Sequence, residues 1–238
     1  MKTVKLCHLY YDIMNLYGEN GNIRALESHL KNANVKCEIH FLTINDNIDF
    51  EKFDFYYIGM GSEENLFMVL NDIMKYKSDI KESINKNKFF LITGNALELF
   101  GEYIENLNGE KTKALNIFDY YSKAIDFRIV GEQVYDTSLI NYPIIGFQNR
   151  SSIIRNGQNN LFNVKNGTGY EPSSTKEGIV YNNFYGTYLL GPVLIRNPHF
   201  TDYIVKNLLK SKKMDYCPKS NTLEYKAYDE FLNLFVSK

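Results

Sequence analysis

The stretch Lys88-Phe-Phe-Leu-Ile-Thr-Gly-Asn-Ala-Leu-Glu-Leu-Phe-Gly101 decides the fold of this chain. An apolar run, Phe89 to Ile92, passes through the small residues Thr93-Gly94-Asn95 into a helix-like segment, Ala96 to Phe100. This order is typical of a strand, a tight turn and a helix at the carboxyl edge of a parallel sheet. Enzymes place a nucleophile at such a turn, beside backbone N–H groups that stabilise a developing anion. Here the turn contains neither cysteine nor serine.

Strands and helical segments alternate on the amino-terminal side of this stretch. The hydrophobic periodicity predicts strands at 4–9, 35–42 and 53–58, and helices at 22–33 and within 64–86. This alternation predicts an α/β fold with a doubly wound, mostly parallel sheet and a ligand crevice at the carboxyl ends of its strands.

The second half of the chain has a different composition. Residues 113–188 are rich in Tyr, Phe, Val, Ile and Thr and are broken by Asn-Gly and Gly-rich turns. This pattern predicts β-hairpins added to the edge or face of the same sheet. Residues 198–209 and 223–235 have the spacing of closing amphipathic helices. With no obvious linker, we expect residues 1–238 to form a single domain.

Composition and charge exclude several classes of protein. The 238 residues carry a net charge of −1, so we expect no nucleic-acid surface and no anionic-membrane surface. No segment approaches the roughly 18 apolar residues of a membrane helix. Three unpaired-looking cysteines favour a reducing cytoplasm. The four histidines are scattered, and we predict neither a metal nor a cofactor.

Several segments, in order, resemble class I glutamine amidotransferases of the cobyric acid synthase type, and most closely the GatD subunit of lipid II isoglutaminyl synthase. The opening, His8-Leu-Tyr-Tyr-Asp-Ile-Met-Asn-Leu-Tyr-Gly-Glu-Asn-Gly-Asn22, is similar to that family's His-Leu-Tyr-Pro…Met-Asn-x-Tyr-Gly-Asp-x-Gly-Asn. Residues 58–63 are similar to its Ile-Gly-Gly-Gly-Gln-Asp loop. The other matching segments are 117–121 with Arg128, 146–149, 186–192 and 197–199. The resemblance implies a flavodoxin-like class I glutaminase fold, a three-layer sandwich.

The chemistry of that family needs a cysteine thiolate at the turn and a histidine that moves protons. The family's turn reads Ile-Cys-Gly-Gly-Tyr-Gln. Counting from the strand places Thr93 at the nucleophile position, whereas counting back from Gly101 places Gly94 there. The family's histidine position holds Leu190. We therefore predict that this chain has no catalytic residues.

Three residues are candidates for binding a substrate or ligand. Arg128 matches an arginine that contacts glutamine in the family, although an ion-paired surface arginine is an equally good interpretation. Gly59 and Gly61 follow a strand and leave backbone N–H groups that can face a ligand, although a plain tight turn explains them too. Glu19 lies in a long turn, where we expect a solvated or capping carboxylate.

The leading functional prediction is an amidotransferase homologue without glutaminase activity. It would act as a partner, regulator or small-ligand binder, with a Mur-ligase-like (MurT-type) protein and glutamine or a similar molecule as candidate partners. The alternative is an active enzyme. This would be either a subunit that hydrolyses glutamine to supply ammonia for peptidoglycan precursor amidation, or an amide hydrolase with a non-cysteine nucleophile, Thr93 or Glu98. A third, weaker interpretation is a flavodoxin-like module that binds an anion at Gly59 and Gly61.

Overall fold

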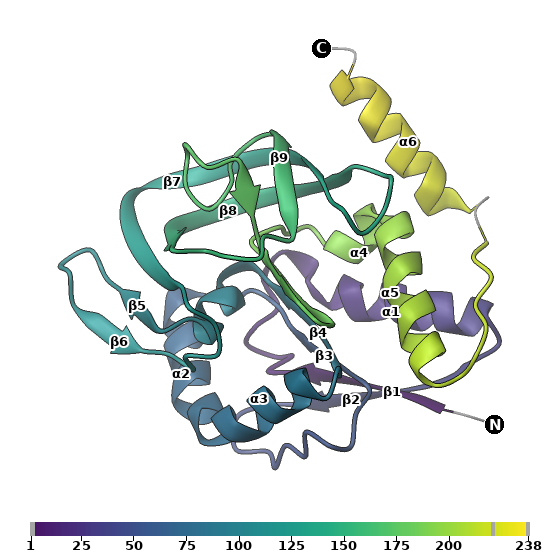
Figure 1. Cartoon of the computed structure of the whole chain (residues 1–238), viewed down its shortest axis with the longest axis horizontal. Coiled ribbons are helices and arrows are strands. Elements are labelled where there is room, and N and C mark those ends of the chain that lie inside the picture. Colours follow the sequence, from purple (N-terminus) through teal and green to yellow (C-terminus); the bar gives the residue numbers. More distant parts are fainter. Residues whose placement is uncertain (1–2, 220–221, 237–238) are drawn as a thin grey trace.

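A six-stranded sheet forms the centre of the molecule, in the order β11-β12-β4-β3-β1-β2 (Figure 1). In this computed structural model, which describes residues 3–219 and 222–236, five of these strands run parallel and β11 pairs antiparallel at one edge. The strands are β1 (Thr3–Leu9), β2 (Lys36–Leu42), β3 (Phe55–Ile58), β4 (Phe89–Thr93), β11 (Ile179–Tyr181) and β12 (Phe184–Thr187). The predicted mostly parallel α/β sheet is confirmed.

Helices cover both faces of this sheet, because its central strands are apolar on both sides. Every residue of β3 and β4 is buried, as expected for parallel strands between two helical layers. On one face, Leu26 and Ile204 pack with Leu91 in one core cluster. On the other face, Val69 packs with Ile92 in a second cluster. The layers are formed by α1 (Asn20–Asn32) and α5 (Pro198–Ser211) on the first face, and by α2 (Glu63–Ile73) and α3 (Lys77–Asn85) on the second (Figure 1).

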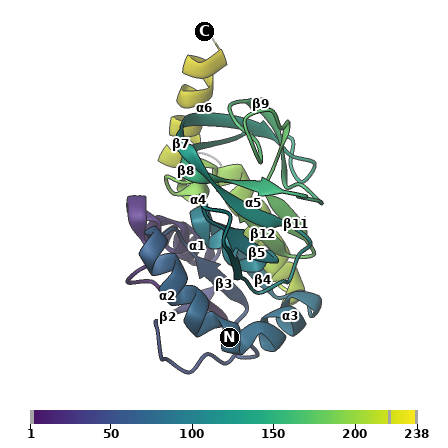
Figure 2. The same ribbon diagram turned by 90° about the vertical axis from the view of Figure 1, so that its left-hand side faces the viewer.

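The remaining strands form a second sheet, which lies over the first (Figure 2). The sequence predicted hairpins at the edge or face of the first sheet: β11 and β12 lie at its edge, and the other strands form the separate second sheet. The long strand β7 pairs with β8 along its length, with β5 near its start and with β9 near its end. Its pairing with β8 shifts register between Ala124 and Ile129. The strands are β5 (Tyr103–Glu105), β6 (Lys111–Lys113), β7 (Tyr121–Asp136), β8 (Ile144–Arg155), β9 (Phe162–Asn166) and β10 (Lys176–Glu177).

The segment after β4 is a 3₁₀ helix, η3 (Gly94–Phe100), where the sequence predicted an ordinary helical segment. All seven of its residues are buried, so packing from every side shapes it. Its carbonyl groups bond to a neighbouring loop and do not continue a helix: Leu115 N–H donates to Leu99 and Ile117 N–H donates to Phe100. The short helices η1 (Leu16–Gly18), η2 (Met74–Tyr76) and α4 (Val193–Arg196) complete the connections.

The final helix, α6 (Leu223–Val236), extends away from the body of the molecule (Figures 1 and 2). Its first turns are fixed by two tyrosines. The Tyr228 hydroxyl donates to the Pro143 carbonyl at 2.6 Å, and the Tyr225 hydroxyl donates to Asp202. Across residues 3–219 and 222–236, no helix has the length and apolar character needed to span a membrane.

Packing of the central strand predicts a large stability loss for Leu91→Ala. Leu91 has no exposed surface, and truncating a buried leucine removes about 2–5 kcal/mol of unfolding free energy through lost burial and the cavity left behind. Urea unfolding followed by circular dichroism measures this loss. Leu107→Ala is the control, because that side chain is 65% exposed and surface changes stay within about 0.5 kcal/mol. Equal losses would contradict the assignment of β4 to the core.

Candidate functional site

In the turn after β4, Gly94 faces Met60 and Leu190, whereas the Thr93 side chain faces Glu19. Gly94 has a φ of +62°, a conformation that side chains other than glycine rarely adopt. A Cβ on Gly94 would lie 2.6 Å from the Met60 Cβ and 2.9 Å from the Leu190 Cδ2. The space in front of Gly94 is therefore filled by these two side chains.

Leu190 is held in place by its backbone. Its N–H donates to the Phe147 carbonyl at 2.8 Å, and the Phe147 N–H donates back to the Leu190 carbonyl at 3.3 Å. This isolated β-bridge joins the end of the first sheet to β8. The side chain of Leu190 is buried and apolar, so it has no group that accepts or donates a proton.

The loop from Gly59 to Gly61 is bonded within the protein. The Gly61 N–H donates to the Asn95 Oδ1 at 3.1 Å, and the Asn95 Nδ2 donates to the Gly61 carbonyl at 2.9 Å. The N–H group expected to face a ligand at Gly61 is therefore occupied. Gly59 is needed for close packing, because a Cβ there would lie 2.6 Å from the Met14 carbonyl oxygen.

Thr93 points to the opposite side of the turn, into a buried polar cluster. Its hydroxyl donates to the Glu19 Oε2 and lies 3.0 Å from the Tyr57 hydroxyl. Tyr57 also donates to Glu19 at 2.8 Å and accepts from the Asn22 Nδ2 at 2.8 Å. A hydroxyl beside a carboxylate is the composition of a nucleophile and its base. Thr93 is nevertheless completely buried, and it does not line the cavity of about 950 Å³ that is described below.

Glu19 is buried where the sequence suggested a solvated or capping carboxylate. It has no exposed surface, and burial raises its pKa to about 7, opposed by the hydrogen bonds from Thr93, Tyr57 and the Gly191 N–H. A buried carboxyl without a cation favours its neutral form. Its place in the opening motif was visible in the sequence, but its burial was not.

A large cavity, with a volume of about 950 Å³, lies between η3, the loop after β3, and strands β7 and β8. Gly61 and Arg128 both line it, so the structure brings two of the predicted binding residues to one cavity. The Arg128 Nη1 donates to the Asn149 Oδ1 at 3.1 Å. Arg128 is an exposed residue, so a ligand in the cavity can reach it.

A buried acid lies in the wall of the same cavity. Glu98 is 5% exposed, and its Oε1 accepts from the Ser152 hydroxyl at 2.5 Å and from the Tyr188 hydroxyl at 3.3 Å. Burial raises the pKa of this carboxyl. Arg150 also lines the cavity, and its guanidinium lies over the Tyr188 ring at 4.2 Å.

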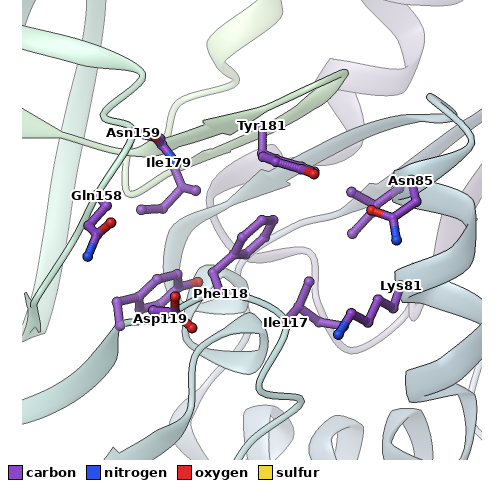
Figure 3. A pocket seen from close by; sticks show the side chains of 11 residues that line it. Lys81, Asn85, Ile117, Phe118, Asp119, Gln158, Asn159, Ile179 and Tyr181 are labelled. Carbon is purple, nitrogen blue, oxygen red and sulfur yellow. The ribbon is translucent and has the colours of Figure 1, made fainter.

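A second cavity, of about 250 Å³, lies between α3, the loop 117–120 and β11 (Figure 3). Phe118 and Tyr181 meet there edge to face, with ring centroids 6.0 Å apart, and Lys81 and Asn85 approach from α3. None of the predicted site residues lines this cavity.

Comparison with known proteins identifies the family of this fold. The model of the CobB/CobQ-like glutamine amidotransferase domain matches residues 5–198, most of the chain. The chain belongs to this family. GatD subunits of lipid II isoglutaminyl synthase (glutamine-hydrolyzing) are among its relatives. The subunit from Staphylococcus aureus (strain N315) is 29% identical over 92% of this chain and 90% of its own length. The subunit from Streptococcus pneumoniae (strain ATCC BAA-255 / R6) is 24% identical over 99% and 89%.

Solved structures confirm the fold of the family. A glutamine amidotransferase from Thermotoga maritima superposes with a TM-score of 0.52 at 12% identity, covering 100% of this chain and 95% of its own. A second glutamine amidotransferase gives a TM-score of 0.51 at 10% identity, covering 86% and 97%. The predicted class I, flavodoxin-like glutamine amidotransferase fold is therefore confirmed, and the chain is a GatD-like member of the family.

Two features of this family member were not predicted from its sequence. Met60 stands where the family's loop has a glycine, and its side chain fills the space in front of Gly94. Asn95 occupies the Gly61 N–H. The substitution at position 60 was the available signal for the first. No signal in the sequence indicated the second, because the pairing joins residues 34 positions apart.

The buried state of Glu19 predicts a pH dependence of stability. Its pKa rises from 4.5 to about 7 on folding, so between these values the folded chain binds the proton more tightly than the unfolded chain. The resulting stabilisation is complete below pH 4.5 and is lost as the pH rises toward 7, an effect of roughly 3 kcal/mol at most. Glu19→Gln should reduce the fall in unfolding free energy between about pH 5 and pH 8.

Denaturant unfolding at several pH values measures this fall. Glu177, whose pKa burial also raises to about 7, should leave a residual slope in the variant. Glu27→Gln is the control: hydrogen bonding to Lys31 lowers the pKa of that acid, so its titration lies below the window. A slope unchanged by Glu19→Gln would show that Glu19 is ionised in the folded protein.

Proposed function

We propose that this chain is a GatD-like subunit that does not hydrolyse glutamine and forms the non-catalytic half of a complex with a Mur-ligase-like partner of the MurT type. The observation that carries the proposal is the contact of Gly94 with Met60 and Leu190. A glutaminase needs a nucleophile and a proton acceptor at this point. Here Gly94 has no side chain, and the apolar side chains of Met60 and Leu190 fill the space beside it.

We assign the family's nucleophile position to Gly94 on the basis of backbone geometry. A nucleophile at a strand-to-helix turn occupies a sharp, strained conformation with its side chain exposed. In this turn Gly94 has the positive φ and faces Leu190, the family's histidine position. Thr93 is the last residue of β4, with extended backbone angles of −120° and 150°. The alignment counted back from Gly101 is therefore preferred.

The same geometry argues against an enzyme that uses Thr93 or Glu98. The Thr93 hydroxyl is enclosed between Glu19 and Tyr57, where a substrate amide has no access. Glu98 does line the cavity. The Ser152 hydroxyl donates to its carboxyl group, which pairs a hydroxyl with a possible base. Burial raises the pKa of Glu98 and favours the neutral acid, and a neutral acid does not take the proton from Ser152.

The partner and ligand follow from the family. Both curated relatives are named as subunits, and the alignments cover about nine-tenths of their length. A chain of the same extent and fold can meet the same kind of partner. The cavity beside Arg128 supports binding of glutamine or a similar small ligand without its hydrolysis. We place the complex in the cytoplasm, in agreement with the free state of Cys7, Cys37 and Cys217.

The direct test is glutamate release from glutamine by the purified chain, alone and after co-expression with the Mur-ligase-like protein. We expect a stable complex in size-exclusion chromatography and no glutamate above the rate without enzyme. Turnover by the complex that is lost in Thr93→Ala would establish the threonine enzyme instead. Turnover that survives this change would place an active site elsewhere in the complex.

Restoring the three changed positions should restore the reaction. Gly94→Cys alone should be inactive and less stable by about 1–3 kcal/mol, because it introduces a strained φ and contacts with Met60 and Leu190. The triple variant Met60→Gly, Gly94→Cys, Leu190→His supplies a thiol, a base and the space for them. We expect its glutamate release to exceed that of Gly94→Cys by at least about 10²-fold.

The matched control is the triple variant with serine at position 94, which has the same space and base but a poorer nucleophile. Glutamate release that requires the cysteine supports the assignment of Gly94. A triple variant that is folded and inactive, alongside an active Thr93→Cys, Leu190→His variant, would show that Thr93 is the true nucleophile position.

A further inference from the structure

The wall of the large cavity contains a carboxyl group with no cation bonded to it. Glu98 is almost fully buried. The hydroxyls of Ser152 and Tyr188 donate to its Oε1, and a hydrogen bond from the Ser122 hydroxyl also opposes the rise of its pKa. All three groups are neutral. In the described part of the chain, Glu98 forms no ion pair. Burying a carboxylate without a cation is costly.

The nearest buried cation, Arg150, is already engaged by neutral oxygen atoms. Its guanidinium donates to the side-chain oxygen of Gln148 and to backbone carbonyls, those of Ser152, Gly169 and Tyr170. Its plane covers the Tyr188 ring. Arg150 therefore influences Glu98 through space and does not complete its hydrogen bonding. Without a bonded cation the Glu98 carboxyl favours its neutral form, and a ligand cation in the cavity would supply the charge that stabilises its ionised form.

The charges around the cavity favour a ligand with an excess of positive charge. Its lining contains five carboxyl groups and two guanidinium groups. One of the five, Glu105, is paired with Lys123 at 2.6 Å. Arg128 is the remaining accessible cation, and its described partner is the neutral side chain of Asn149. One anionic group on the ligand can therefore bind at Arg128, while the rest of the lining favours cationic groups.

We infer that the cavity binds a diamino acid, a small molecule with a carboxylate held by Arg128 and a side-chain ammonium held by Glu98. This ligand class rests on the proposed absence of glutamine hydrolysis, because a diamino acid has no side-chain amide to hydrolyse. An ammonium gives Glu98 a charge-assisted hydrogen bond. The neutral amide of glutamine gives the same carboxylate only an uncharged donor, and leaves the excess negative charge unbalanced.

Isothermal titration of the purified chain with L-ornithine, L-lysine and L-glutamine tests the inference. We expect the wild-type chain to bind L-ornithine or L-lysine at least about tenfold more tightly than L-glutamine. Glu98→Gln should weaken binding of the diamino acid by at least about tenfold and remove the preference over glutamine. Arg128→Gln should weaken binding of all three amino acids, since it removes the shared carboxylate contact.

Glu230→Gln is the control, because Glu230 is exposed on α6 and is not among the residues that line the cavity. It removes the same charge and should leave the affinity within about twofold of the wild type. Equal weakening by Glu230→Gln and Glu98→Gln would overturn the inference in favour of a general charge effect. A wild-type chain that binds glutamine at least as tightly as both diamino acids, or binds none of the three, would also overturn it.

The wild-type comparison does not depend on the folding of any variant, and the unfolding midpoint of Glu98→Gln shows whether that variant is native. The titration also distinguishes this inference from the proposed function. Glutamate release by the complex would contradict the proposed function whatever the chain binds. Absence of glutamate release together with a preference for glutamine would overturn the ligand class alone.

Discussion

Glu19 is a carboxylic acid with no exposed surface, and its hydrogen bonds join parts of the chain that are far apart in sequence. It accepts from Thr93 at the end of β4, from Tyr57 in β3, and more weakly, at 3.4 Å, from the Gly191 N–H. Asn22 extends the same cluster to α4 by accepting the Leu194 N–H. Burying such groups is favourable only when their hydrogen bonds are made. The turn after β4, the opening loop and the segment before α4 therefore have to assemble together.

This cluster lies behind the turn, and the family's chemistry would lie in front of it. The backbone that would present a nucleophile is thus stabilised by groups on the opposite side of β4, independently of the residue at position 94. The bridge between Leu190 and Phe147 fixes the second position in the same way, through main-chain atoms. Side chains in front of the turn can change while the backbone stays. The space at the front is filled by Met60 and Leu190, and the adjoining cavity with Arg128 remains open.

Much of the fold followed from the sequence because its signals are local. Alternating apolar runs and helical spacing located the strands and helices of the first hundred residues, and residue matches identified Leu190 and Arg128. Other features depend on distant residues. The choice between Thr93 and Gly94 needs a backbone φ angle, which a one-residue offset in an alignment cannot supply. The burial of Glu19 depends on β3, β4 and the segment before α4, and the second sheet depends on the pairing of β7 with β5, β8 and β9.

The close packing of Met60, Gly94 and Leu190 also restricts the mutational routes by which the chain can change. A side chain added at position 94 meets two neighbours at less than 3 Å, so it is tolerated only after at least one of them has become smaller. A histidine introduced at position 190 on its own would be a buried polar group without an assigned partner. A change at position 94 or at position 190 alone is therefore unfavourable, and the effects of substitutions at positions 60, 94 and 190 depend on one another. The backbone suited to a thiol persists, but a thiol returns at low cost only when its neighbours change as well.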